Sequence, residues 1–128
     1  MLRLAASGKP IRVVADHVAS PTYAPWLAER TIELAERGLR GVFHVGGGTP
    51  IPWFDFARMI FEAAGLNPEL TATNEREYRT AARRPKYSAL SNAKMEASGI
   101  APMPPLRQAL EAYFAKRNAA GEITGSRV

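Results

Sequence analysis

Hydrophobic positions along the chain follow two patterns, short β-branched runs and longer stripes in which apolar residues recur every three or four positions. The runs predict strands at Ile11–Val14, ending near Asp16, and over residues 42–45, with extended pieces at 70–73 and 88–90. The stripes predict helices over residues 1–6, 26–37 and 53–64, and from Leu106 onward. A polar helix is expected over residues 75–82, ended by Pro85, and a short one over residues 92–99.

Strands that alternate with helices predict an α/β fold with crossover connections. Only two strands are convincing, and parallel strands need both faces covered, so the expected sheet is too small for a complete doubly wound domain. A length of 128 residues suits one domain. We place it at residues 1–117 and expect residues 118–128 to form a polar, disordered tail.

The chain carries 17 Lys plus Arg against 12 Asp plus Glu, a formal net charge of +5. One segment without acidic residues holds five cations: Arg79, Arg83, Arg84, Lys86 and Lys94. These five positive charges equal the whole net charge, so the positive and negative charges in the rest of the chain balance. This concentration favours a site for a small phosphorylated ligand over a nucleic-acid surface, on which cations are spread more widely. On charge alone, a solvated surface strip explains the segment as well.

Several functions are excluded or disfavoured by composition. The chain has no cysteine, which excludes disulfides, thiolate metal clusters and a cysteine nucleophile. His17 and His44 have no companion at metal-ligand spacing, so no metal site is expected. Apolar stretches are too short to span a membrane, and no signal peptide opens the sequence. We expect a cytoplasmic protein with no membrane contact.

Two segments carry candidate binding chemistry. The loop after the first predicted strand holds Asp16, Ser20, Thr22 and Tyr23, and in α/β proteins ligands bind beyond the carboxyl ends of strands. An Asx or Ser/Thr turn leading into the next helix explains these residues equally well. In the second segment, Arg83 and Arg84 precede a proline, and guanidinium groups match the geometry of phosphate. The alternative is an arginine that binds backbone carbonyls.

Three glycines, Gly46–Gly48, lie where a phosphate-binding loop would lie, between a predicted strand and a helix. The dinucleotide-binding fingerprint needs a third glycine at position 51, and that residue is Ile51. No Gly-Lys-Ser/Thr sequence follows either. We therefore interpret the glycines as residues that allow a tight strand-to-helix turn.

Three stretches, in order and spacing, are similar to those of one family. They are Asp16-His17-Val18-Ala19-Ser20-Pro21-Thr22-Tyr23-Ala24, Gly41-Val42-Phe43-His44-Val45 with the helix from Trp53, and Thr80-x-Ala82-x-Arg84-Pro85-x-x-Ser88-x-Leu90. Together they resemble the dTDP-4-dehydrorhamnose reductases, which are extended short-chain dehydrogenase/reductases. The resemblance covers roughly residues 1–114. The chain departs from the family pattern at His17, where Gln is usual, and at Ala19, where Gly is usual.

The resemblance implies the small C-terminal substrate-binding domain of such an enzyme, with few short strands and about five helices, lacking the Rossmann core. It implies a dTDP-sugar substrate, with Asp16, Ser20, Thr22, Tyr23, Arg83 and Arg84 as substrate-binding residues. NADPH would be bound by an N-terminal Rossmann domain or a partner chain. This chain has no Tyr-x-x-x-Lys pair and no glycine-rich cofactor turn, so we expect no catalytic residue and no cofactor here.

Two other functions remain open at this stage. Relatives such as the regulatory subunit of methionine adenosyltransferase resemble these reductases but are non-catalytic binding modules. Nucleic-acid binding through residues 79–94 is the least favoured, because only Tyr87 interleaves the cations as a stacking surface. A domain lacking its Rossmann half should expose a contiguous apolar patch, so we also expect a homo-oligomer or a sticky monomer.

Overall fold

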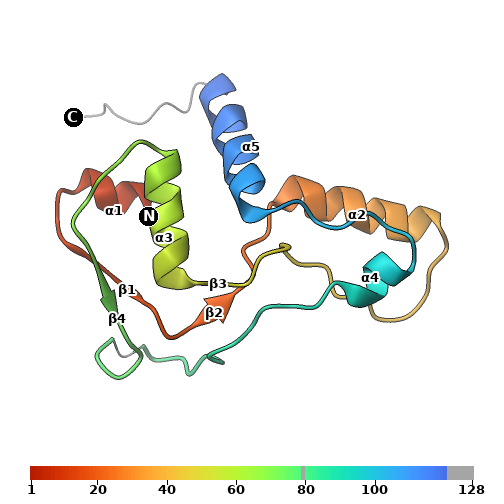
Figure 1. Ribbon diagram of the computed structural model, residues 1–128, viewed down its shortest axis with the longest axis horizontal. Helices are drawn as coiled ribbons and strands as arrows, with labels where there is room; N and C mark the ends of the chain where they lie inside the picture. Colours follow the sequence, from red (N-terminus) through yellow and green to blue (C-terminus); the bar gives the residue numbers. More distant parts are fainter. Residues whose placement is uncertain (79, 121–128) are drawn as a thin grey trace.

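The structure, a computed structural model, describes residues 1–78 and 80–120 (Figure 1). Arg79 of the basic segment and residues 121–128 of the expected tail lie outside the described residues. The elements in chain order are α1 (Leu2–Ala6), β1 (Ile11–Val14), β2 (Val18–Ala19), α2 (Ala24–Glu36), β3 (Ile51–Pro52), α3 (Trp53–Ala63), β4 (Leu70–Thr73), α4 (Ala93–Ala97) and α5 (Leu106–Ala119).

β1 and β4 form a parallel pair, in register from Ile11 opposite Leu70 to Val14 opposite Thr73. α3 lies between them in the sequence and covers one face of the pair, as a crossover helix does. Side chains alternate across a strand, so Ile11 and Val13 both face α3 and are buried against it. The expected α/β fold, with a few short strands and five helices among the described residues, is confirmed.

A second pairing joins β2 to β3 in antiparallel fashion, with Val18 opposite Pro52 and Ala19 opposite Ile51. On its other side, Val18 forms a parallel bridge with Tyr87. The short segment after β1 therefore lies between the start of α3 and the basic segment, residues 79–94, to which Tyr87 belongs. This position makes residues 16–19 a junction between parts that are far apart in the sequence.

Three small clusters of buried side chains form the core. The first cluster joins β1 to α3, and its buried members are Ile11, Val13, Ala57 and Phe61. The second joins β3 to α5, and its buried members are Ile51, Leu106, Ala109 and Leu110. The third includes one residue of α4 and two residues after it: Met95, Ile100 and Met103. Ile60 borders the first two clusters and Trp26 the last two. The hydrophobic interior is thus continuous but thin.

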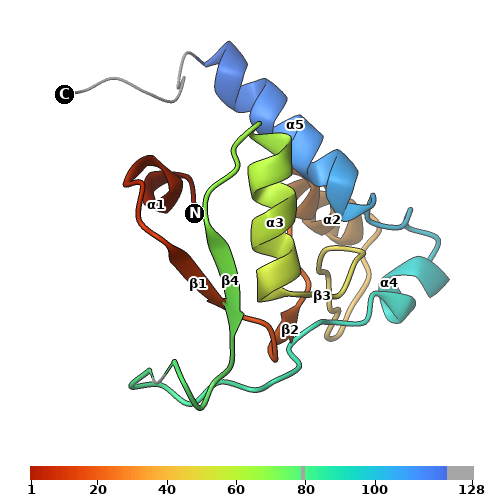
Figure 2. The same ribbon diagram turned by 60° about the vertical axis from the view of Figure 1, so that its left-hand side comes forward.

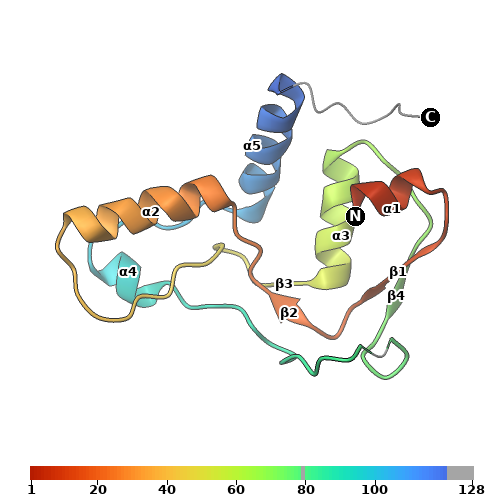
Figure 3. The same cartoon turned by 180° about the vertical axis from the view of Figure 1, so that it is seen from behind.

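The elements are spread along the long axis of the molecule. α1, β1, β4 and α3 lie toward one end, and α2 with α4 lies toward the other, as views from opposite sides agree (Figures 1 and 3). Turning the molecule shows α5 running beside α3 (Figure 2), where Leu110 and Ile60 belong to the same cluster. The first end carries the pocket that is described below.

The strand expected over residues 42–45 is wrong, because this segment is extended but pairs with no strand among the described residues. Val42 is 73% exposed. Side chains hold the segment instead: the Lys94 ammonium donates to the Val42 carbonyl at 2.7 Å and lies 4.3 Å from the centre of the Phe43 ring. The apolar run matched a strand in composition but had no neighbour to pair with.

The polar helix expected over residues 75–82 is also wrong, since the described part of this segment consists of turns. The Asn74 side-chain oxygen accepts the backbone N–H groups of Arg76 and Glu77, at 3.0 and 3.1 Å. An asparagine in this position caps the start of a helix, and the Tyr78 N–H donates to the Asn74 carbonyl at 2.9 Å, but the described residues after Tyr78 do not continue the helix. The brief strand expected at residues 88–90 is reduced to the single bridge at Tyr87.

Candidate functional site

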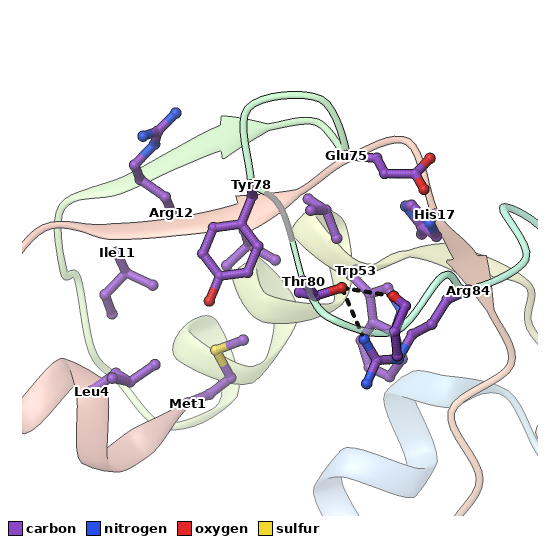
Figure 4. A pocket seen from close by; sticks show the side chains of 13 residues that line it. Met1, Leu4, Ile11, Arg12, His17, Trp53, Glu75, Tyr78, Thr80 and Arg84 are labelled. Carbon is purple, nitrogen blue, oxygen red and sulfur yellow. Dashed lines mark hydrogen bonds between the residues drawn. The ribbon is translucent and has the colours of Figure 1, made fainter.

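A pocket of about 330 Å³ opens between α1, β1, the start of α3 and the segment after β4 (Figure 4). Its volume is in the range of sites that hold small organic ligands. The residues that line it are Met1, Leu4, Ile11, Arg12, Val13, Val14, His17, Trp53, Glu75, Tyr78, Thr80, Ala82 and Arg84. Most of the wall is apolar, and the polar groups are few.

The two ends of the pocket differ in chemistry. Met1, Leu4 and Ile11 gather at one end in the close view, and His17, Glu75 and Arg84 at the other (Figure 4). An apolar wall with a few charged groups at one end fits a ligand that has an uncharged part and an anionic part.

Arg84 brings a positive charge to the polar end. One guanidinium nitrogen donates to the Thr80 hydroxyl at 3.3 Å, and that hydroxyl donates to the Ala82 carbonyl at 2.8 Å. Arg84 forms no ion pair with a carboxylate within residues 1–78 and 80–120, whereas Arg12 is paired with Glu77 at 2.9 Å. Arg84 therefore keeps most of its donors for an anion.

Two aromatic side chains border the pocket, and sequence reasoning did not identify them as site residues. Trp53 is 39% exposed and Tyr78 is 54% exposed. Trp53 is held at the first position of α3, where its N–H donates to the His17 carbonyl at 3.1 Å. In the sequence, the one indication for Trp53 was a large aromatic residue at the start of a predicted helix. No feature of the sequence indicated that Tyr78 belongs to the site.

Asp16 lies behind the pocket wall rather than in the lining. Its carboxylate accepts the Glu75 N–H, with 3.3 Å to each oxygen, contacts His17 Nδ1 at 3.1 Å, and lies 3.7 Å from the Lys86 ammonium. Burial alone would raise the pKa of Asp16, but the Glu75 and Asp16 N–H groups and His17 outweigh it, so the pKa lies below its ordinary value. The carboxylate is therefore ionised and already engaged by the protein.

Ser20 and Thr22 make hydrogen bonds between loops. The Thr22 hydroxyl donates to the Ser20 carbonyl at 2.9 Å and accepts the Gly47 N–H at 2.8 Å. The Ser20 hydroxyl accepts the Leu90 N–H at 3.3 Å. These contacts match the turn interpretation of the loop, and they hold three loops together.

The six predicted site residues do not share one pocket. Arg84 lines the 330 Å³ pocket, while Thr22 and Tyr23 border a smaller hollow of about 120 Å³ beside α5. The Tyr23 ring packs edge-on against Trp26, with 5.0 Å between ring centres. Arg83 is exposed and lies outside the lining of both pockets.

Two other loops, one at Pro21 and one at Met103, lie very close to the backbone of the glycine segment, Gly46–Gly48. A Cβ atom on Gly47 would lie 1.9 Å from the Pro21 carbonyl oxygen, and one on Gly48 would lie 2.8 Å from that of Met103. Because protein backbone fills this space, the glycines do not form an open cradle for the diphosphate of NADPH. The predicted structural role is supported, but it comes from loop packing and not from a turn after a strand.

Neither a cluster of metal ligands nor a membrane-spanning helix occurs in the described part of the chain. Residues 1–78 and 80–120 contain no group of three or more His, Asp or Glu side chains placed to hold a metal ion. Nor does any helix in these residues have the length and apolar character needed to cross a membrane.

Fold and pocket together define a small α/β ligand-binding domain. The chain belongs to the family described as RmlD substrate binding domain, which it matches over residues 1–119. This confirms the resemblance drawn from the three sequence stretches.

Curated and solved relatives agree with this assignment. The chain is 38% identical to the spore coat polysaccharide biosynthesis protein SpsK of Bacillus subtilis, over 94% of this chain and 42% of that protein. It is 36% identical to a dTDP-4-dehydrorhamnose reductase of Mycobacterium tuberculosis, over 90% of this chain and 38% of that one. The crystal structure of dTDP-4-dehydrorhamnose reductase from Bacillus anthracis in complex with NADP superposes with a TM-score of 0.85 at 33% identity, covering 90% of this chain and 41% of that one.

The chain spans about two fifths of the length of these relatives. What it shares with them is the substrate-binding part.

Proposed function

We propose that this chain is the substrate-binding part of a dTDP-4-dehydrorhamnose reductase-like enzyme, which reduces the 4-keto group of a dTDP-deoxysugar in dTDP-rhamnose biosynthesis. The hydride would come from NADPH bound by a Rossmann domain. The glycines of this chain do not fit that cofactor, so its own residues contribute to binding the sugar nucleotide and not to the transfer.

One observation carries the proposal. This chain, a member of the family, has a largely apolar pocket bordered by two aromatic side chains, and the arginine at the polar end of that pocket has no carboxylate partner among the described residues. A nucleoside diphosphate sugar offers a planar base and a dianionic diphosphate. Exposed Trp53 and Tyr78 supply surfaces on which a base can stack, and Arg84 supplies donors for phosphate oxygens.

The other predicted residues act around this contact. Arg83 adds a second positive charge next to Arg84. Asp16, Ser20 and Thr22 make hydrogen bonds that fix the loops near the sugar of the ligand. Tyr23 lines the adjoining hollow of about 120 Å³. Exposed Met1 and Leu4, at the apolar end of the pocket, supply surface that the Rossmann domain would cover.

The reductase names of the relatives favour this function over a non-catalytic regulatory module. Nucleic-acid binding is disfavoured because two of the five cations of the basic segment are already engaged: Lys86 by Asp16 at 3.7 Å and Lys94 by the Val42 carbonyl at 2.7 Å.

The first prediction concerns Arg84. Removing the guanidinium by Arg84→Ala should weaken dTDP binding by about tenfold or more, since a hydrogen bond to a charged group contributes about 1.5–3 kcal/mol. Isothermal titration of the full chain with dTDP measures this. Arg58→Ala is the matched control: it removes the same charge from the exposed side of α3, where Arg58 pairs with Asp55 at 3.2 Å. Equal binding by the unaltered chain and Arg84→Ala would exclude the role given to Arg84.

A further inference from the structure

We propose that Asp16 is a positioning residue: its carboxylate fixes the start of the segment over residues 75–86 and thereby holds Arg84 at the pocket. This rests on the proposed function for the part played by Arg84, but not for the placement of the segment. Asp16 would thus act on the ligand through another residue.

The start of the segment is held by the carboxylate where the strand pairing stops. The last backbone bond beside β1 and β4 runs from the Ala15 N–H to the Thr73 carbonyl, at 2.8 Å. Beyond that bond, the Glu75 N–H donates to the Asp16 carboxylate, with 3.3 Å to each oxygen. A side-chain acceptor therefore continues the attachment after the two strands separate.

The end of the segment is held two residues further along the same stretch. The Val18 N–H donates to the Lys86 carbonyl at 2.7 Å, and the Ser88 N–H donates to the Val18 carbonyl at 2.9 Å. These are backbone bonds, so they persist whatever side chain stands at position 16. Residues 16–18 hold both ends of the segment, one end through a side chain and the other through backbone.

Between these anchors, residues 76–78 and 80–85, which the structure describes, have few attachments to other parts of the chain. The Thr80 hydroxyl contacts Ala82 and Arg84, which are members of the same segment. Asn74 binds the N–H groups of Arg76, Glu77 and Tyr78, but these bonds lie within one turn of neighbouring residues. Glu77 reaches further, because it pairs with Arg12 at 2.9 Å and accepts from the Thr73 hydroxyl at 3.2 Å. Both members of the Arg12–Glu77 pair are largely exposed, and exposed ion pairs stabilise little. The position of Arg84 therefore depends strongly on the anchors at the two ends.

A variant of Lys86 separates the effect of the ion pair of Asp16 with Lys86 from that of its hydrogen bond with the Glu75 N–H. Its ammonium lies 3.7 Å from Asp16, but its side chain is 67% exposed. We expect the Glu75 bond to fix the segment and the Lys86 pair to add little. Lys86→Met should then leave the segment in place, while Asp16→Ala should release its start.

The test measures the segment without ligand. Backbone ¹⁵N order parameters of the full chain report the motion of residues 75–84 on the fast time scale. In Asp16→Ala they should fall, while those of α3 stay unchanged. Asp16→Asn, which keeps one oxygen acceptor in the same shape, should lie between Asp16→Ala and the unaltered chain. Glu62→Ala, which removes an exposed carboxylate on α3, is the matched control. Unchanged order parameters in Asp16→Ala overturn the proposal.

Binding of dTDP gives a second, separate readout. Asp16→Ala should weaken it at least threefold, and the double variant Asp16→Ala/Arg84→Ala should bind no more weakly than Arg84→Ala alone, because Asp16 acts through Arg84. Additive losses would mean that Asp16 contacts the ligand independently, and would overturn the proposal. If the unaltered chain does not bind dTDP, the proposed function fails, and the order parameters alone decide the placement of the segment.

Discussion

At the scale of single residues, Gly47 shows how tightly the loops around the site are packed. A side chain there would begin 1.9 Å from the Pro21 carbonyl oxygen, so one of the two loops must move, with loss of the 2.8 Å bond from the Gly47 N–H to the Thr22 hydroxyl. We expect Gly47→Ala to lower the free energy of unfolding by about 1–3 kcal/mol, the usual cost of overpacking. Urea denaturation measures this change.

Its neighbour Gly46 provides the comparison for that experiment. A Cβ atom on Gly46 would lie 3.0 Å from the Ser20 hydroxyl, which is a rotatable side-chain atom and not backbone. Gly46→Ala should therefore cost less than Gly47→Ala. Equal costs, or a larger one at Gly46, would mean that the contact with Pro21 relaxes easily and does not determine the spacing of the loops.

At the scale of elements, Asn92 takes the place of a missing strand. Its side-chain oxygen accepts the Gly46 N–H and its amide donates to the Gly46 carbonyl, both at 2.9 Å, as a neighbouring strand would. Asn92 and Gly46 are buried, so Asn92→Ala leaves two backbone groups without partners. We expect a loss of about 1–3 kcal/mol in thermal or urea unfolding. Asn67→Ala, at an exposed position after α3, should change stability little; a similar loss there would contradict this account.

Elements with a buried stripe could be predicted from the sequence, and those that depend on a partner could not. Ala57 and Phe61, spaced four residues apart, placed α3 correctly and are both buried. The apolar run from Val42 predicted a strand, but periodicity does not reveal whether another strand lies beside it. Asn74 caps a single turn, but the polar residues after it have no apolar stripe to bury, and most helical stability in proteins comes from packing such a stripe.

The same division applies to the candidate site. Charge and a following proline were enough to find Arg84, which lines the pocket. Asp16 was found as a polar residue after a strand, but its contact with Glu75 depends on a segment 59 positions away. Trp53 and Tyr78 were missed because the exposure of an aromatic residue is decided by tertiary packing and not by its own spacing.

At the scale of the whole molecule, the junction at residues 16–18 links β1, the start of α3 and the basic segment, so the charge of Asp16 should affect global stability. The pKa of Asp16 is lowered in the fold from its ordinary value of 3.8. Its ionised form therefore stabilises the folded protein fully above that value, and the contribution is lost as pH falls through the lower, folded pKa. The charged or titratable groups that face the carboxylate are His17 and Lys86.

Unfolding measured against pH tests this contribution. The stability difference between the unaltered chain and Asp16→Asn should narrow as the pH falls below the ordinary aspartate value, because protonation turns the acid into a neutral group that resembles the amide. Glu62→Gln, at an exposed position of α3, corrects for the general effect of removing a carboxylate. A difference that stays constant down to the lowest pH at which the chain remains folded would mean that the ionised carboxylate of Asp16 does not hold the junction together.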